Sequence, residues 1–344
     1  MPTKDDLKLL QNLPLEIKIA KTKLRIREWI DYYGTDGVYV SFSGGKDSTV
    51  LLHIVRSMYP NVEAVFVNTG LEYPEIQKFV KNFDNVTILR PEMRFDEVIK
   101  KYGYPILSKE ISEIVSQARV HISNKTEKYS YRLKQLNGER VDKNGKPCFN
   151  HSKYKPLLYT DFLVSHSCCV VMKKQPIKKY EKQQGKTPIT AQMAEESILR
   201  QKQWIRSGCN AFERKRPVSN PMSFWTEQDV LQYINQYNIP IASVYGEVVY
   251  AEEPDQIRFA GCEGGKLKTT GCDRTGCVFC AFGAHIRGDK RFQRLKETHP
   301  KQYEYCIGGG EYVDGIWQPN KQGLGMGHVF DELNKIYGDG FIKY

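Results

Sequence analysis

The sequence lacks the features of a membrane or exported protein. No run in its 344 residues approaches the ~18 to 20 consecutive apolar residues of a membrane-spanning helix. The opening residues, MPTKDDLKLL, contain no apolar core of a signal peptide. Low-complexity tracts and internal repeats are also absent. We therefore expect a soluble, cytoplasmic protein without a membrane partner, long enough for one large α/β domain plus an appendage or for two smaller domains.

Acidic residues are in the minority. The chain has 51 lysines and arginines against 40 acidic residues, a formal net charge of +11. This excess suits an anionic nucleotide or a polyanionic partner, and charge alone does not choose between them. The nine cysteines, in a chain without an export signal, favour metal ligation or thiol chemistry over a disulfide framework.

The most informative stretch is residues 38–58, VYVSFSGGKDSTVLLHIVRSM. A short β-prone run, a glycine turn and an amphipathic helix follow one another there, so backbone N–H groups and the helix N-terminus can close around an anion. It is not a Walker A loop, which would need glycine at Val40 and serine or threonine at Asp47. The candidate nucleotide-binding residues of the turn are Ser43, Gly44, Gly45, Lys46, Asp47 and Ser48.

A second loop is expected to face the same crevice. Residues 63–67 predict a buried parallel strand, which ends in Asn68, Thr69 and Gly70. Because ligands of open α/β sheets bind at the carboxyl ends of the strands, we expect these three residues to contribute to nucleotide binding.

These motifs resemble those of one enzyme superfamily. SGGKDS resembles the PP-loop of the ATP pyrophosphatase and sulfonucleotide reductase superfamily. Residues 68–75, NTGLEYPE, resemble the reductase segment D-T-G-x-x-[FY]-P-E-T, and residues 188–197, PITAQMAEES, resemble I-T-G-x-R-x-x-E-S. Met193 stands in place of the arginine of that second segment. This difference weakens the inference that the chain uses the same substrate as the reductases. Lys173, Lys174 and Arg200 are candidates to replace its charge.

The cysteines form a second constellation. Two adjacent thiolates, Cys168 and Cys169, make poor geometry on one tetrahedral zinc, whereas separate irons of a cubane cluster can take one each. With Cys277 and Cys280 they favour a [4Fe-4S] cluster over zinc, and buried reduced thiols are a third reading. A rival ligand set for zinc or a cluster lies within one glycine-rich segment: Cys262, Cys272, Cys277 and Cys280.

The order C-C-x-x-x-K followed by C-x-x-C also occurs in adenylyl-sulfate reductases, and Lys173 stands at the matching lysine. Reductases of this kind attack the substrate sulfur with a cysteine near the C-terminus, and the ending GDGFIKY has none. By resemblance, Cys306, which precedes a glycine run, is the candidate nucleophile; a half-buried structural thiol is the alternative. Lys46, Lys173 and Cys306 form the predicted catalytic set.

The resemblance implies a member of the phosphoadenosine/adenosine phosphosulfate (PAPS/APS) reductase family. Its fold would be a doubly wound, mainly parallel α/β sheet, with a cysteine-rich C-terminal segment folding back over the nucleotide crevice. The expected parts are an N-terminal helical segment (1–35), a PP-loop domain (36–260) with an exposed basic insertion near 124–156, and the C-terminal segment (261–344). A cysteine thiolate would attack the sulfonate of bound APS or PAPS, and a thioredoxin-like dithiol would release sulfite.

Two alternatives keep the nucleotide site. In the first, the chain uses ATP to insert sulfur into nucleic acid, as in tRNA thiolation or DNA phosphorothioation. Met193, the basic insertion and residues 213–216, ERKR, favour this reading. In the second, the chain is a non-catalytic nucleotide-binding protein. The oligomeric state, a homo-oligomer included, stays open.

Overall fold

The structure, a computed structural model, describes residues 2–125, 128–251 and 265–344. The chain forms two compact units, each assembled from separate stretches of sequence. The first unit comprises residues 1–68, 72–90 and 177–275, and the second comprises residues 69–71, 91–176 and 276–344. The three-part division expected from the sequence stays a prediction, because its boundary at 260/261 lies outside the described residues.

A six-stranded sheet forms the centre of the first unit, in the order β3-β2-β1-β5-β7-β6. Neighbouring strands run parallel, except that β6 pairs antiparallel with β7. This arrangement confirms the predicted α/β class with a mainly parallel sheet. The strands are β1 (Val38–Ser41), β2 (Ala64–Val67), β3 (Val86–Leu89), β5 (Thr187–Ile189), β6 (Asn210–Ala211) and β7 (Val218–Ser219).

The sheet is wound in two directions from β1. The chain passes through α3 (Lys46–Met58) to β2 and through α4 (Pro74–Val80) to β3, and later reaches β5 on the other side of β1 after α8 (Gln175–Gln184). Right-handed crossovers place α3 and α4 on one face of the sheet and α8 on the other. The core between the sheet and α8 is formed by Tyr39, Val65 and Tyr180. The change of direction beside β1 creates a topological switch point, where open α/β sheets bind ligands.

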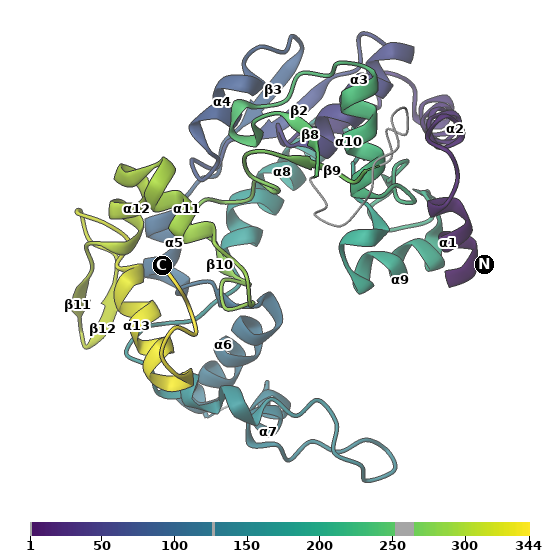
Figure 1. Ribbon diagram of the computed structural model, residues 1–344. Helices are drawn as coiled ribbons and strands as arrows, with labels where there is room; N and C mark the ends of the chain where they lie inside the picture. The colour runs from purple at the N-terminus through teal and green to yellow at the C-terminus, as the bar shows by residue number, and fades with distance from the viewer. Residues whose placement is uncertain (1, 126–127, 252–264) are drawn as a thin grey trace. The chain divides into compact units, whose positions relative to one another are not determined.

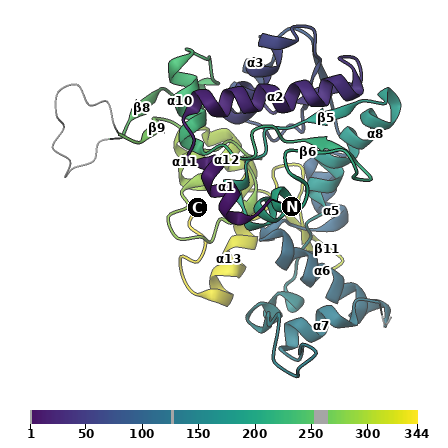
Figure 2. The ribbon, with the colours of Figure 1, turned by 90° about the vertical axis from the view of Figure 1, so that its right-hand side faces the viewer.

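The N-terminal segment forms two helices, α1 (Lys4–Gln11) and α2 (Leu15–Tyr33), and belongs to the first unit. Helix α2 packs against α3 and α10 (Glu227–Gln236), as Figures 1 and 2 show. Lys18 Nζ, buried in this contact, donates to Asp229 Oδ2 at 2.6 Å. The same oxygen accepts the Thr226 N–H at 2.6 Å, so one carboxylate both caps α10 and binds α2. None of the helices in the described ranges is both long and apolar enough to span a membrane.

Short elements complete the first unit around the carboxyl ends of β5 and β7. Helix η3 follows β5 and leads into α9, and η4 packs against α4. The antiparallel pair β8 and β9 packs against α10. These elements are η3 (Ala194–Glu196), α9 (Ile198–Ser207), η4 (Ser243–Tyr245), β8 (Val248–Tyr250) and β9 (Leu267–Thr269).

The second unit is mainly helical and contains two small sheets. Strand β4 (Ile106–Leu107) pairs parallel with β10 (Ala281–Phe282), and β11 (Glu311–Val313) pairs antiparallel with β12 (Ile316–Gln318). The first pair joins two distant parts of the sequence, the segment that leads into α6 and the segment that follows the C-x-x-C motif. The helices are α5 (Phe95–Tyr102), α6 (Lys109–Asn124), α7 (Ser130–Asn137), η1 (Ser152–Tyr159), η2 (Val170–Lys174), α11 (Arg291–Thr298), α12 (Pro300–Ile307) and α13 (Met326–Tyr337).

Candidate functional site

The SGGKDS turn joins β1 to α3, as predicted. Gly45 is the N-cap of α3, and Lys46 is the first residue of the helix. Gly44 has φ +70°, and a Cβ there would lie 2.8 Å from methyl groups of Ile76 and Val80. Both the backbone conformation and the close packing of α4 therefore require glycine at position 44.

The serine hydroxyls hold the turn in shape. Ser48 Oγ donates to the Gly45 carbonyl oxygen at 3.0 Å and accepts the Ser43 N–H at 3.1 Å. The two hydroxyl oxygens of Ser43 and Ser48 lie 3.0 Å apart, and the Gly45 N–H donates to Ser43 Oγ at 3.3 Å. These serines, predicted as ligand donors, therefore first serve to order the loop around the helix N-terminus.

Lys46 is held by residues that are distant in the sequence. Its side chain is buried, its Nζ donates to Glu227 Oε1 at 3.0 Å, and it lies 5.5 Å from the ring centroid of Tyr245. The Tyr245 hydroxyl accepts the Lys46 backbone N–H at 3.4 Å and contacts Thr275 Oγ1. Burial raises the pKa of Tyr245 to about 12, so this hydroxyl stays protonated at neutral pH. Glu227, Tyr245 and Thr275 were missed by sequence reasoning, since only the fold brings them to the loop.

Positive charge gathers around the start of α3. Burial raises the pKa of Asp47 above its ordinary value of 3.8, although Lys46, Arg274 and Arg200 act in the opposite direction. These three cations and the Glu227 carboxylate all lie close enough to act on Asp47, so cations outnumber carboxylates near the N-terminus of α3. That combination favours an anionic group.

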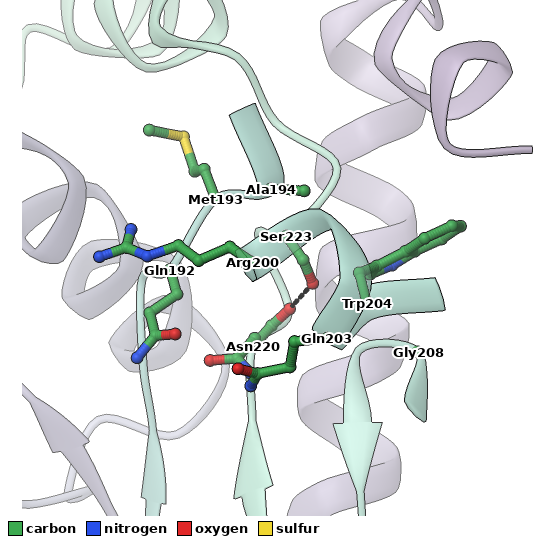
Figure 3. A pocket seen from close by; sticks show the side chains of 9 residues that line it. All are labelled: Gln192, Met193, Ala194, Arg200, Gln203, Trp204, Gly208, Asn220 and Ser223. Carbon is green, nitrogen blue, oxygen red and sulfur yellow. Dashed lines mark hydrogen bonds between the residues drawn. The ribbon is translucent and has the colours of Figure 1, made fainter. Parts of the chain in front are cut away.

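A pocket lies where β5 and β7 end, and β5 is the neighbour of β1 in the sheet (Figure 3). Met193, which replaces the arginine of the family motif, lines it together with Arg200. Arg200 forms an ion pair with Glu196, and in Figure 3 its guanidinium lies on the same side as the amide of Gln192. The pocket is lined by Gln192, Met193, Ala194, Arg200, Gln203, Trp204, Gly208, Asn220 and Ser223.

Of the three cations considered as replacements for the missing arginine, Arg200 thus lies beside Met193. Lys173 and Lys174 belong to the second unit.

The loop after β2 falls at the division between the units. Asn68 directly follows β2, at the same sheet edge as the end of β1, and its N–H donates to the Leu89 carbonyl oxygen at 2.9 Å. Thr69 and Gly70 belong to the second unit, where Thr69 Oγ1 accepts the Leu71 N–H at 3.2 Å. The position of Asn68 suits a ligand at this edge, and the role of Thr69 and Gly70 stays a prediction.

Four of the predicted thiols line one cavity in the second unit. The cavity is lined by Leu71, Phe95, Pro105, Cys168, Cys169, Met172, Lys173, Cys277 and Cys280. The structure therefore brings the adjacent pair, the C-x-x-C motif and Lys173 together. Of the rival ligand set, Cys272 is buried in the first unit, and Cys262 lies outside the described residues.

Local chemistry explains how the adjacent pair is presented. Cys169 precedes η2, a π-helical stretch in which the Gln175 N–H donates to the Val170 carbonyl oxygen. The next residue, Pro176, has no N–H and its ring crowds the carbonyl four residues earlier, so a regular α-helical turn cannot form there. Such π-helical turns are frequent at functional sites.

The C-x-x-C motif is a turn fixed at several points. The Cys280 N–H donates to the Cys277 carbonyl oxygen at 3.0 Å, and the Val278 N–H donates to the Leu71 carbonyl oxygen at 2.8 Å. Arg291 Nη1 donates to the Cys280 carbonyl oxygen at 2.9 Å. The turn then continues into β10, whose pairing with β4 holds it near the start of α6.

Lysines surround the adjacent thiols. The pKa of Cys169 lies below its ordinary value because it accepts a hydrogen bond from Cys168 and because Lys109, Lys173 and Lys174 are close. The same hydrogen bond, together with burial, raises the pKa of Cys168. The pair therefore favours a thiolate at Cys169 and a thiol at Cys168.

Cys306 has a different environment. It lies in α12, is fully buried, and its Sγ is 3.8 Å from Met326 Sδ. Burial raises its pKa, which favours the unreactive thiol over the thiolate. The glycine run that follows is closely packed, since a Cβ at Gly310 would lie 2.2 Å from the Trp317 ring. As placed here Cys306 packs as a core residue, and its role as nucleophile stays a prediction.

The fold and the first loop together define a class. A mainly parallel α/β sheet in which the first strand leads through SGGKDS into a helix N-terminus, beside a switch point, has the architecture of the PP-loop superfamily.

The particular family follows from the sequence profile of the phosphoadenosine phosphosulfate reductase domain, which matches residues 37–137 and 110–282. These ranges cover well over half of the chain. The chain belongs to the phosphoadenosine phosphosulfate reductase family.

Individual relatives match over shorter segments. An uncharacterized protein of Methanocaldococcus jannaschii, MJ0973, is 36% identical over 73 residues, 20% of this chain and 18% of that protein. Adenosine 5′-phosphosulfate reductase of Bacillus cereus is 32% identical over 90 residues, 24% of this chain and 38% of the reductase. Phosphoadenosine 5′-phosphosulfate reductase of Xylella fastidiosa is 33% identical over 79 residues, 23% of this chain and 32% of the reductase. The matched segments thus span well under half of each of these relatives.

One solved structure, the phosphate complex of phosphoadenylyl-sulfate (PAPS) reductase from Candida auris, aligns with 71% of this chain and 91% of its own, at 13% identity and a TM-score of 0.38.

The raised pKa of Asp47 gives a pH-dependent prediction. The folded protein binds more protons at Asp47 than the unfolded chain does, so this residue's contribution to the free energy of unfolding falls as pH rises above 3.8. We expect Asp47→Asn to raise Tm at neutral pH, with a gain that shrinks toward acid pH, measured by differential scanning fluorimetry. Asp84→Asn, at an exposed position of the same unit, is the control and should show no such trend. A wild type more stable than Asp47→Asn at neutral pH would contradict the prediction.

Proposed function

We propose that this chain binds an adenine nucleotide or sulfonucleotide in its first unit and carries out reductive sulfur chemistry, with four cysteines of its second unit holding a [4Fe-4S] cluster. The observation that carries the proposal is the cavity lined by the Cys168–Cys169 pair, Cys277, Cys280 and Lys173, in a chain of the phosphoadenosine phosphosulfate reductase family.

Nucleotide phosphates would bind at the N-terminus of α3. The loop orders its own backbone through Ser43 and Ser48, so its N–H groups are positioned before a ligand arrives. Lys46 now donates to the half-exposed Glu227 carboxylate. When a nucleotide binds, Lys46 would donate to a phosphate oxygen instead, and Glu227 would no longer be its partner. Arg200, beside Met193, would supply the charge of the family's missing arginine.

The thiols fit a polynuclear group in the second unit. In the described part of the chain, no three histidine, cysteine, aspartate or glutamate side chains converge where they could hold one metal ion. A cubane takes one thiolate on each of its four irons, and four thiols line the cavity. Lys109, Lys173 and Lys174 would stabilise the thiolates that such ligation requires. When bound, the cluster would have an electrostatic role rather than an electron-transfer role, as the family resemblance implies.

The proposed reaction transfers a sulfonate to a protein thiolate. The thiolate attacks the sulfonate sulfur of APS or PAPS, the sulfur–oxygen bond to the phosphate breaks, and AMP or its 3′-phosphate leaves with the electron pair. A thioredoxin-like dithiol then attacks the cysteine sulfur, sulfite leaves, and the dithiol ends as a disulfide. Cys306 is the proposed nucleophile, and to act it would have to leave its contact with Met326.

Product analysis tests the reaction. We expect sulfite and AMP from APS, or sulfite and the 3′-phosphorylated nucleotide from PAPS, in the presence of thioredoxin, and no sulfite from Cys306→Ser. A Cys306→Ser enzyme that keeps its turnover while its Tm falls would instead make Cys306 a core residue only. No sulfite from either sulfonucleotide, from protein that binds both, would overturn the reductase proposal.

Lys46→Ala should weaken nucleotide binding by at least ~1.5 kcal/mol, roughly tenfold, because a charge-assisted hydrogen bond is lost. Isothermal titration calorimetry with ATP, APS and PAPS measures this. Glu227→Gln is the matched control: it removes the partner of Lys46 and keeps the lysine, so affinity should stay or increase. Unchanged nucleotide affinity in Lys46→Ala would show that the SGGKDS loop is not part of the nucleotide-binding site.

Metal analysis tests the cluster independently of activity. Anaerobically purified wild type should contain iron and acid-labile sulfide, and Cys168→Ser and Cys277→Ser should each lose most of both. Cys148→Ser, a change to a cysteine that does not line the cavity, should retain them. Zinc in the wild type, or iron retained in Cys168→Ser but lost in Cys277→Ser, would contradict the proposed ligand set.

A second candidate keeps the nucleotide site and uses ATP to insert sulfur into nucleic acid. It is favoured by Met193 in place of the family's arginine and by the basic insertion near 124–156. Pyrophosphate or AMP from ATP, stimulated by tRNA or DNA and accompanied by no sulfite from APS or PAPS, would establish it over the reductase.

A further inference from the structure

Residues 128–156, which we call the basic arm, carry a charge that the proposed reductase chemistry does not use. The arm contains eight lysines and arginines and two acidic residues. Its net positive charge is therefore more than half of the chain's formal net charge of +11. One of its two acids is engaged in a turn, because Asp142 Oδ1 accepts the N–H groups of Asn144 at 2.8 Å and Lys146 at 3.0 Å. The arm therefore presents a strongly positive surface.

The arm is fixed to the rest of the second unit at its base. Helix α7 buries Gln135 and Leu136 and packs against α6 and η1. Arg119 of α6 donates to the carbonyl oxygens of Leu157, Thr160 and Phe162, which ties the end of η1 to that helix. This attachment gives the exposed side chains of the arm a defined support.

Beyond α7 the chain forms a tight hairpin. Val141 is bridged to Pro147, and the Cys148 N–H donates to the Arg140 carbonyl oxygen at 2.9 Å. The two lysines of the turn, Lys143 and Lys146, are exposed. Among the described residues, no ion pair engages the five lysines Lys134, Lys143, Lys146, Lys153 and Lys155.

Aromatic rings alternate with these cations at the surface. Phe149 is 61% exposed and Tyr131 is 44% exposed, in contrast to the buried aromatics of the core. The Arg140 guanidinium carbon lies 4.8 Å from the Phe149 ring centroid and 6.0 Å from that of Tyr131, and Arg132 lies 4.8 Å from Tyr131. Phe149, Arg140 and Tyr131 thus form a set of flat π surfaces, which adjoins Arg132, itself ion-paired with Glu113.

We propose that the basic arm binds single-stranded nucleic acid. Lysines that lack an acidic partner attract phosphates, while exposed rings and guanidinium planes stack on unpaired bases. An acidic peptide would satisfy the lysines but would leave Phe149 and Tyr131 without a stacking partner. A duplex offers phosphates but keeps its bases stacked inside, so it would use only the charges. This proposal does not rest on the reaction carried out by the chain.

Fluorescence anisotropy with the full-length protein tests the proposal. The probes are labelled RNA and DNA single strands of about 20 nucleotides, longer than the roughly 4 to 16 that one single-strand site covers, and the same sequences as duplexes. We expect the single strands to bind more tightly than the duplexes, with affinity falling as NaCl increases. Comparing the affinities for the RNA and DNA strands shows which of the two nucleic acids the arm prefers.

Two variants separate charge from stacking. Lys143→Ala/Lys146→Ala should reduce the slope of log K against log salt by about 1.4, roughly 0.7 for each lost phosphate contact. Phe149→Ala should weaken single-strand binding roughly fivefold or more and leave the salt slope unchanged. Lys301→Ala/Lys321→Ala is the matched control: it removes the same charge at exposed positions outside the arm and should bind like wild type.

Three outcomes would overturn the proposal. They are equal loss of binding in the Lys301/Lys321 control, unchanged binding in Phe149→Ala, and binding of a polyglutamate peptide as tight as that of the single strands. Lys46→Ala, assayed in parallel, should keep its affinity for the strands. A failure of the nucleotide site is thereby distinguished from a failure of the arm.

Discussion

Strand β1 sets the position of every part of the nucleotide loop. It pairs in parallel with β2 on one side and β5 on the other, so the strand is fixed in the middle of the sheet. The chain leaves its carboxyl end directly into α3, and the N–H groups of that helix point to the edge where β2 and β5 also end. The change of winding beside β1 leaves this edge uncovered by crossover helices. The loop, Asn68 and the pocket beside Met193 all follow from this one arrangement.

Charged side chains at the start of α3 are partly desolvated, which is unfavourable unless they are paired. Asp47 is half-buried, and desolvation raises its pKa in spite of the nearby cations. Lys46 lies in a buried position, where Glu227 accepts its hydrogen bond. A bound phosphate would take over the role of Glu227, and the site therefore holds opposing charges ready to be rearranged on binding.

The chain departs from the family pattern in ways that the structure interprets. Arg200 lies in the same pocket as Met193, so a cation is present although the motif's arginine is absent. The thiol proposed as nucleophile is packed against Met326, and the thiols with nearby lysines are those of the cavity. The basic arm adds an exposed surface whose chemistry suits nucleic acid. Family membership therefore fixes the scaffold, and the substrate has to be decided by experiment.

The sequence by itself determined the local features of the protein. Alternation of apolar strands and amphipathic helices predicted the α/β class, and SGGKDS predicted a strand–turn–helix because glycines and a helix start act within a few residues. The adjacent cysteines and the C-x-x-C motif were also identified from order and spacing, and Lys173 from the resemblance to adenylyl-sulfate reductases.

Only the tertiary structure decided which distant residues meet. Glu227, Tyr245 and Thr275 reach the loop through packing of segments far along the chain, and no local pattern marks them. The same holds for the choice of Arg200 over Lys173 and Lys174 beside Met193, and for the full burial of Cys306. Burial and charge pairing depend on all neighbours at once, whereas sequence patterns report only the residues within one element.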